Sequence, residues 1–285
     1  LDADAGHYVD STGQSSQTVC AEGTYQPSTG QAACLDADAG HYVPTTGQSS
    51  QTACSAGTYQ PSTGQASCLD ADAGHYAPAT GQSSQTVCAV GTYQPSTGQA
   101  ACLDADPGHY VPTTGQTSQT PCPAGTSNPL AGSSSQDSCI STDAGYYSEN
   151  GSASQTACLP GTYQPSTGQA NCIPSSPGYF VSTYAATSQS PCDLGSYQPE
   201  AGQTDCIYAQ PGHYVPTTGQ LNQTQCLLGT YQPSSGQSSC IDASPGHYVP
   251  TNGSSSQTPC VPGSYQATTG QSSCAEASPG YYVPT

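Results

Sequence analysis

The cysteines of this 285-residue chain recur at intervals that alternate between 14 and 20 residues, and this spacing restricts the possible folds more than any other feature. A cysteine-bounded segment, CAEGTYQPSTGQAAC at 20–34, returns almost unchanged at 54–68 and 88–102. Beneath the 34-residue period lies a shorter one of half that length, because the motif G-x-Y recurs twice in each period. A fixed period of this size indicates a repeat architecture in which neighbouring units stack on one another.

Two kinds of 17-residue half-unit alternate along the chain. An A half-unit lies between two cysteines, as in 20–34, whereas a B half-unit, such as DADAGHYVPTTGQSSQTAC, has a cysteine only at its end. Both contain a glycine two residues before an aromatic ring. This ring recurs once in each half-unit from Tyr8 to Tyr110 and again from Tyr163 to Tyr282, with one phenylalanine in the series. The alternation predicts one structural part that is used many times.

One repeat, at 122–158, departs from this pattern. Ser127 stands where the aromatic ring is expected, the cysteine-bounded loop is three residues longer, and the next half-unit, which contains Tyr147, is one residue shorter. A bend, a subunit contact or sequence drift would each explain the departure. We therefore expect 1–285 to form one tandem array of about eight 34-residue repeats within a longer chain.

The composition does not provide a conventional hydrophobic core. The chain has no Trp, no Met and one Phe, whereas a compact domain of this length would bury many large apolar side chains. Sixteen regularly spaced cysteines are instead typical of small extracellular modules stapled by disulfides. The expected fold class is a small disulfide-rich repeat array: an elongated rod of short β-hairpins and turns, with little regular secondary structure and no single hydrophobic core.

The A half-unit predicts a hairpin closed by a disulfide. In TYQPSTGQ the proline favours a type I turn, and Gly30 can adopt the left-handed conformation that closes it. Short strands such as 24–26 would flank the turn and bring Cys20 and Cys34 opposite each other, within disulfide reach. We therefore expect sequential cysteines to pair, although a shifted scheme that begins with Cys34 and Cys54 stays possible if the chain continues. The sequential pairs are Cys20–Cys34, Cys54–Cys68, Cys88–Cys102, Cys122–Cys139, Cys158–Cys172, Cys192–Cys206, Cys226–Cys240 and Cys260–Cys274.

Stability in such an array would come from disulfides and from stacking. A disulfide that closes a loop of about 15 residues stabilises a fold by roughly 3 kcal/mol. A tyrosine that buries about 200 Å² against a neighbour adds about 5 kcal/mol. A lone repeat does not offset its own ordering entropy, so we expect neighbouring units to share interfaces through their tyrosines.

The spacing C-x-x-G-x-Y, with a second cysteine at the fourteenth position after the first, resembles the first disulfide loop of tumour-necrosis-factor-receptor cysteine-rich domains. It is also similar to the ephrin-receptor-like cysteine-rich repeats of extracellular proteins. Cys20, Gly23, Tyr25 and Cys34 carry the resemblance, as do their equivalents in the other A half-units. The resemblance implies an elongated ectodomain with a series of disulfides between neighbouring cysteines, as in large microbial surface proteins that carry such arrays.

The charge of the chain excludes several functions. It has 18 Asp and Glu residues and neither Lys nor Arg. Nucleic acids and anionic membrane surfaces are bound through cationic side chains, so neither is an expected partner. No apolar stretch approaches the roughly 20 residues of a transmembrane helix, so we expect no membrane insertion by this segment. Because catalysis needs one asymmetric constellation and the sequence offers near-identical copies, we expect no enzyme and no cofactor.

Two repeated side-chain patterns could suggest metal binding. The D-x-D-x-G segments are fragments of a calcium loop, which makes Asp36, Asp38, Asp70 and Asp72 calcium candidates. The remaining ligands of such a loop are missing, so turns with solvated carboxylates, and no metal site, are the expected outcome. The six histidines share one B position, G-H-Y, where three B half-units have tyrosine instead. We therefore interpret this position as packing against a neighbouring unit.

Glycosylation is the more specific signal. Asn150, Asn222 and Asn252 each begin an N-x-S/T acceptor triplet, and the Ser/Thr-rich segments beside proline suit O-linked sugars. We predict a glycosylated structural component of an extracellular fibre or cell-surface stalk, with copies of itself as partners. The alternatives are an adhesin or receptor-like ectodomain that binds a glycan or protein ligand, and a spacer stiffened by calcium.

Overall fold

The computed structural model describes residues 2–281, so Tyr282, the last ring of the aromatic series, lies outside the described residues. The chain divides into two compact units. Unit 1 comprises Leu1–Ile140 and Glu149–Ser154, and unit 2 comprises Ser141–Ser148 and Gln155–Thr285. The division therefore falls inside the irregular repeat.

Each half-unit forms one antiparallel hairpin of two short strands. In the first complete A half-unit, β3 (Thr24–Tyr25) pairs with β4 (Leu35–Asp36). In the B half-unit that follows, β5 (His41–Tyr42) pairs with β6 (Thr52–Ala53). Consecutive strands pair in this way from β1 to β32, so every sheet within residues 2–281 has two strands. The fold is thus the repeating array of disulfide-stapled hairpins that the cysteine spacing predicts.

The remaining strands have the same two-residue length. Up to the irregular repeat they are β1 (His7–Tyr8), β2 (Thr18–Val19), β7 (Thr58–Tyr59), β8 (Leu69–Asp70), β9 (His75–Tyr76), β10 (Thr86–Val87), β11 (Thr92–Tyr93), β12 (Leu103–Asp104), β13 (His109–Tyr110), β14 (Thr120–Pro121), β15 (Thr126–Ser127) and β16 (Ile140–Ser141). They continue as β17 (Tyr146–Tyr147), β18 (Thr156–Ala157), β19 (Thr162–Tyr163), β20 (Ile173–Pro174), β21 (Tyr179–Phe180), β22 (Ser190–Pro191), β23 (Ser196–Tyr197), β24 (Ile207–Tyr208), β25 (His213–Tyr214), β26 (Thr224–Gln225), β27 (Thr230–Tyr231), β28 (Ile241–Asp242), β29 (His247–Tyr248), β30 (Thr258–Pro259), β31 (Ser264–Tyr265) and β32 (Ala275–Glu276). Among the described residues, the 3₁₀-helix η1 (Gln136–Ser138) is the one helical element, and no helix could cross a membrane.

The hairpin differs from the predicted one in the position of its second strand. The expected strand over 24–26 is shorter, and its partner lies beyond Cys34 and not before it. The cause is Gln26, which leaves the strand because its N–H donates to the carbonyl of Gln48 in the next half-unit, at 3.0 Å. Gly30 does adopt the predicted left-handed conformation, with φ +67°. The loop between the strands is therefore longer than expected, and Cys34 lies at its base.

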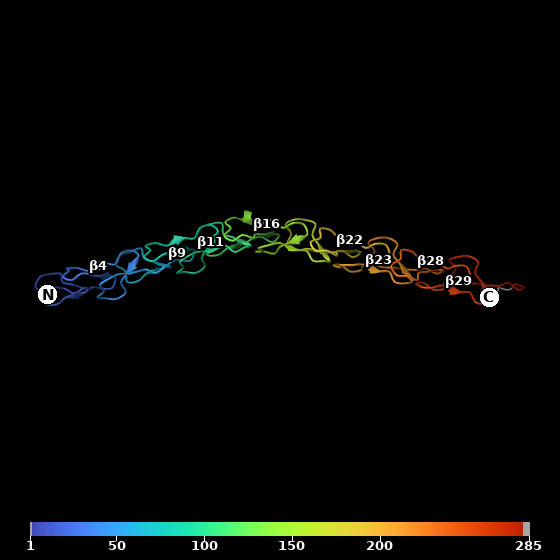
Figure 1. Cartoon of the computed structure of the whole chain (residues 1–285), viewed down its shortest axis with the longest axis horizontal. Coiled ribbons are helices and arrows are strands. Elements are labelled where there is room, and N and C mark those ends of the chain that lie inside the picture. The colour runs from blue at the N-terminus through green and yellow to red at the C-terminus, as the bar shows by residue number, and fades with distance from the viewer. Residues whose placement is uncertain (1, 282–285) are drawn as a thin grey trace. The chain divides into compact units, whose positions relative to one another are not determined.

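Backbone hydrogen bonds join each half-unit to the next within a unit. The N–H of Gly23 donates to Val43 (2.9 Å), and the N–H of Gly47 donates back to Cys20 (2.8 Å). The same bonds recur in the following half-unit, where Gly40 donates to Gln60 and Gly64 to Ala37, both at 2.8 Å. Because the pattern repeats, the hairpins follow one another in chain order, as β4, β9 and β11 do in unit 1 and β22, β23 and β28 in unit 2 (Figure 1).

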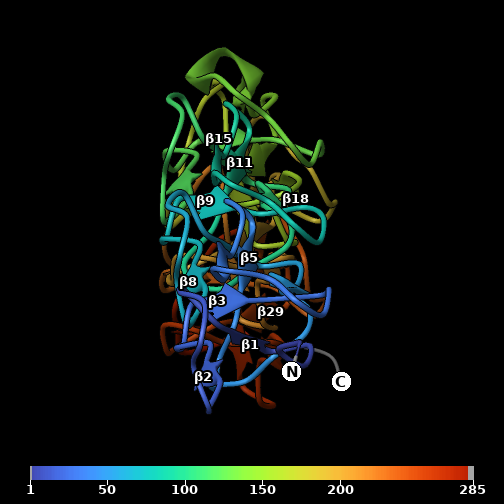
Figure 2. The ribbon, with the colours of Figure 1, turned by 90° about the vertical axis from the view of Figure 1, so that its left-hand side faces the viewer.

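The interior of each unit is a narrow column of small residues. Away from the two ends of the array, three positions at intervals of three residues are buried in each half-unit: Cys20, Gly23 and Gln26 in an A half-unit, and Ala37, Gly40 and Val43 in a B half-unit. The tyrosines that were expected to form the shared interfaces are only half-buried, for example Tyr25 and Tyr42. Backbone and small side chains therefore fill the interior. In Figure 2 the strands β1, β3, β5, β9 and β11 of unit 1 follow one another in chain order.

Candidate functional site: the packing column and its disulfides

From Gly6 to Gly229, the first glycine of a half-unit, which lies two residues before the ring, packs against the backbone of the half-unit two positions along. A Cβ added at Gly40 would collide with the carbonyl group of Gly81, and one added at Gly57 would collide with that of Gly98. The first of these contacts joins two B half-units, and the second joins two A half-units. The close approach therefore requires glycine, and it stacks like hairpins on like hairpins.

A positive φ is the second reason for glycine in this position. Gly40 has φ +83°, a conformation that L-residues with a Cβ adopt only under strain. The second glycine, seven residues later in regular half-units, also has positive φ, for example +74° at Gly47. Ala185 occupies this second position in one B half-unit and is the one non-glycine residue with positive φ among those described, at +52°.

Eight disulfides connect the column to the hairpin loops. The pairs are sequential neighbours, from Cys20–Cys34 to Cys260–Cys274, and no cysteine of the described chain is free. The Cα atoms of Cys20 and Cys34 are 5.8 Å apart. Cys20 is fully buried in the column, whereas Cys34 is half-buried at the base of the loop. Each bridge therefore fixes a loop to the interior, and such bridges are typical of proteins that fold in an oxidising compartment.

A buried glutamine organises the A loop, and sequence analysis missed it. Gln26 is 4% exposed; its Nε2 donates to the Ala33 carbonyl at 2.7 Å, and its Oε1 accepts from the Ser28 N–H at 3.1 Å. The side chain is thus satisfied although it is buried, as a core amide must be. The signal was present in the sequence, because glutamine follows the tyrosine at the same position in most A half-units. The buried equivalents are Gln60, Gln94, Gln164, Gln198 and Gln232.

A second glutamine closes the B hairpin. Gln51 accepts from the Asp38 N–H through Oε1 and donates to Asp38 Oδ2 through Nε2, both at 2.6 Å. Asp72 makes the same pair of bonds with Gln85. This reciprocal contact, which we call the Gln clamp, explains why glutamine recurs in the S-S-Q-T segment of the B half-units.

The calcium candidates serve different contacts in the structure. Asp38 and Asp72 belong to Gln clamps, whereas Asp36 and Asp70 pack against second glycines of the following A half-units, with Asp36 Cγ 3.4 Å from a Cβ position at Gly64. Within the described residues, no group of three or more His, Cys, Asp or Glu side chains could hold a metal ion. The four carboxylates are therefore not brought together as one ligand set.

Two of the histidines, His41 and His109, lie where neighbouring B half-units meet. His41 is half-buried, and its Cε1 atom is 3.9 Å from a Cβ position at Gly81 in the next B half-unit. Its Nδ1 atom lies 3.4 Å from the Ala39 carbonyl of its own turn. The His109 ring is likewise 3.4 Å from a Cβ position at Gly151, which belongs to the irregular repeat. This placement supports the interpretation that the position selects a flat ring for packing.

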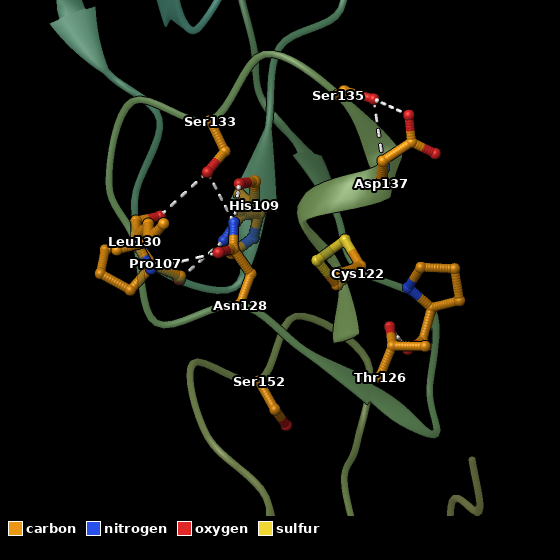
Figure 3. The surroundings of a disulfide bond; sticks show 12 residues. Pro107, His109, Cys122, Thr126, Asn128, Leu130, Ser133, Ser135, Asp137 and Ser152 are labelled. Atoms are coloured by element: carbon orange, nitrogen blue, oxygen red, sulfur yellow. Dashed lines mark hydrogen bonds between the residues drawn. A yellow bond between two sulfur atoms is a disulfide. The ribbon is translucent and has the colours of Figure 1, made fainter. Parts of the chain in front are cut away.

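The irregular repeat keeps the column and changes the loop around it. Asn128 replaces the buried glutamine and is fully buried; its Nδ2 donates to Ser133 Oγ (2.9 Å) and to the His109 carbonyl (3.2 Å), while its Oδ1 accepts from the Leu130 N–H (3.1 Å) (Figure 3). The Cα atoms of Cys122 and Cys139 are 5.6 Å apart, close to the regular value.

The additional residues of this loop form η1 away from the column. Ser135 caps the helix, because its Oγ accepts from the Asp137 N–H at 3.1 Å (Figure 3). The insertion therefore changes the surface of the repeat and leaves its interior intact.

The glycosylation candidates all lie in B half-units. Asn150, Asn222 and Asn252 are exposed, and none of them contributes to the column.

No protein-family model matches this chain, and a search of the curated proteins finds no match either. The resemblance to receptor cysteine-rich modules therefore consists of what the structure itself contains: tandem hairpin repeats, each stapled by a disulfide.

Proposed function

We propose that this chain is a structural component of an extracellular fibre or cell-surface stalk, and that its half-units are repeated to produce length. The observation that carries this proposal is the identity of the contacts from one half-unit to the next. The backbone bonds between Gly23 and Val43 recur between Gly40 and Gln60, and between later pairs, at 2.7–2.9 Å. A repeat that contacts only its near neighbours can be added without altering those already present.

The disulfides support the extracellular part of the proposal. Each repeat has its own bridge, so each is stabilised where it lies and does not depend on one large core. A surface without Lys or Arg is also uniformly acidic or neutral, which favours solubility over binding to polyanions. Assembly with copies of the same chain and an elongated form belong to this proposal.

Small-angle scattering and electron microscopy of the secreted, unreduced chain test it. A compact globule of this length would have a radius of gyration of roughly 19 Å. We expect a value well above that, with rods or uniform fibres in the micrographs. Fibres would favour a fibre subunit, and isolated rods would favour a stalk. A radius near that of a globule would refute both.

A ligand-binding ectodomain is the second candidate, and the irregular repeat favours it. Its loop is the one cysteine-bounded loop that differs from its neighbours in length, and it exposes Leu130 at 64%. The test replaces 122–139 with the regular loop 88–102 and measures binding to a glycan array. Binding that the replacement abolishes, with hairpins and disulfides retained, would favour this function; equal binding, or none, by both chains would count against it.

A further inference from the structure

We infer that Asn150, Asn222 and Asn252 are attachment sites for N-linked glycans, carried on B hairpins alone. The inference rests on the proposed extracellular function, because a chain encounters the sugar donor only when it enters the secretory pathway. It goes further by naming the sites, the class of the modifying substrate and the part of each repeat that the sugars would occupy.

Two of the three asparagines occupy the same structural position. Asn150 and Asn252 each directly precede the second glycine of a B half-unit, Gly151 and Gly253, which have φ values of +74° and +72°. The position is the same although the half-unit of Asn150 is one residue shorter. The sequon therefore lies at the same turn in two half-units of different length.

The backbone beside these asparagines is anchored, and their side chains are not. The N–H of Gly253 donates to the Cys226 carbonyl at 2.8 Å, and the N–H of Gly151 donates to Cys122 at 2.9 Å, which ties each turn to a buried cysteine of the column. The asparagine side chains are exposed and make no hydrogen bond with other described residues. A substituent on the amide nitrogen would therefore break no contact of the fold.

The turn has room for a large group. Tyr184 occupies the equivalent position, directly before Ala185, in another B half-unit, and the residue is 67% exposed. The Ala185 N–H still donates to the Cys158 carbonyl at 2.9 Å, so the bulky ring leaves the anchoring bond in place. This native substitution shows that the stacking tolerates bulk where the sequons lie.

The third site is at a different exposed bend. Asn222 follows Leu221, which is 47% exposed, and precedes Gln223, whose Oε1 accepts from the Gln210 N–H at 2.7 Å. The hydroxyl residue of this triplet, Thr224, is exposed in β26. The bend is thus fixed by its neighbour while the asparagine itself faces solvent.

The two asparagines outside sequons provide the contrast. Asn128 is fully buried and hydrogen-bonded within its loop, and Asn171 is exposed but is followed by Cys172 and Ile173, so no hydroxyl residue completes a triplet. In this chain, all asparagines that begin a sequon lie at positions where a sugar fits.

The reaction is a glycosyl transfer from a sugar held as a phosphate ester. The amide nitrogen Nδ2 bonds to the anomeric carbon and loses one proton, while the bond from that carbon to the phosphate oxygen breaks and the phosphate leaves. No A half-unit contains a sequon. Because like hairpins stack on like hairpins, the glycans would follow the B hairpins and leave the A hairpins uncovered.

The test uses the full chain with a secretion signal in a eukaryotic host. Intact masses are measured before and after enzymatic removal of N-glycans, and free thiols are counted on the same material. We expect three glycans on the wild-type chain and two on Asn252→Gln and on Ser254→Ala. Ser254→Thr keeps the triplet and should keep three, and Asn171→Gln is the matched exposed control that should also keep three.

The outcomes separate this inference from the proposed function. A secreted chain with eight disulfides and an unchanged mass would overturn the glycan sites and leave the structural role standing. If the enzyme removes fewer than three glycans from the wild-type chain, the inference is wrong for each asparagine that carried none. Three glycans on a compact globule would support the sites and refute the fibre or stalk. A chain retained in the cell with reduced cysteines would count against both.

Discussion

Units 1 and 2 are built from the same kinds of hairpin, but their B half-units differ in the residue that contacts the clamp glutamine. In unit 1 the Gln clamp uses a carboxylate, as in Asp38 with Gln51, where both bonds are 2.6 Å. In unit 2 only the first B half-unit, with Asp143, keeps this acceptor. The later ones retain the bond from the backbone to glutamine, at 2.6–2.7 Å, with Ser176, Gln210 and Ser244 in place of aspartate.

This difference shows which contacts define the fold. The backbone bond to glutamine and the packing of the first glycine persist in both units, whereas the side chain of the clamp residue varies. Contacts made by the backbone are therefore common to all the repeats. The carboxylates of unit 1 add a side-chain bond that most B half-units of unit 2 lack. Four contacts, from the disulfides to the Gln clamp, can be removed in each unit to find which of them the two units share.

The largest effect is expected from removing one disulfide in each unit. Replacing Cys88 and Cys102 by alanine in unit 1, or Cys226 and Cys240 in unit 2, should lower the free energy of local unfolding by about 3–5 kcal/mol. The loss combines loop entropy with a small cavity, because Cys88 and Cys226 are fully buried. Native-state hydrogen exchange on the full chain measures it unit by unit.

Equal losses would support a common backbone design. A loss confined to one unit would show that the two units differ in what stabilises them.

The next effect tests the close approach of the first glycine. Gly74→Ala in unit 1 and Gly212→Ala in unit 2 should each cost about 2–4 kcal/mol, from the strain of positive φ together with overpacking. Their added Cβ atoms would collide with the carbonyls of Gly115 and Gly253. Denaturant unfolding of the 285-residue chain measures the loss.

Gly246→Ala is the matched control for both. It lies in the same G-H-Y motif and has φ +79°, but no atom of the described residues lies within 4 Å of its added Cβ. We expect only the φ cost, about 1–2 kcal/mol. A loss at Gly246 as large as at Gly212 would mean that conformation alone, and not packing, selects glycine.

These experiments also separate what the sequence could predict from what it could not. The hairpins, the sequential disulfides and the left-handed Gly30 follow from local chemistry, because turn residues and cysteine spacing act within one half-unit. The column does not, because its contacts join residues of different half-units and different repeats, as between Gly40 and Gly81. Tyrosine has the largest area to bury, so we expect it at the interfaces between units, where glycine, alanine, cysteine, valine and glutamine are buried instead.

The burial of the A-loop glutamine is a second feature that the sequence alone does not predict. Polarity argues for exposure of Gln26, yet its amide finds two backbone partners inside its own loop. The recurrence of this glutamine is visible in the sequence. The pattern Cys-x-x-Gly-x-x-Gln in A half-units is equivalent to the pattern Ala-x-x-Gly-x-x-Val in B half-units. Only the geometry of the loop shows that the polar group is satisfied when buried.

A smaller effect, of opposite sign, is expected where unit 2 lacks a second glycine. Ala185→Gly should stabilise unit 2 by about 0.5–1 kcal/mol, because release from φ +52° exceeds the added entropy of the unfolded chain. The reverse change, Gly81→Ala in unit 1, should destabilise by a similar amount, since its Cβ would meet nothing closer than 3.9 Å. A lower melting temperature for Ala185→Gly would contradict the strain argument.

The smallest effect distinguishes the clamps themselves. A double-mutant cycle of Asp38→Ala and Gln51→Ala should give a coupling of about 0.5–1 kcal/mol, the usual value for one exposed hydrogen bond that involves a charge. The cycle of Ser244→Ala and Gln257→Ala should give almost none, because that glutamine bonds to the Ser244 backbone, which alanine retains. Equal couplings would mean that the carboxylate contributes nothing. In that case the aspartates of unit 1 would have to be explained by the surface they present, and not by the hairpin they close.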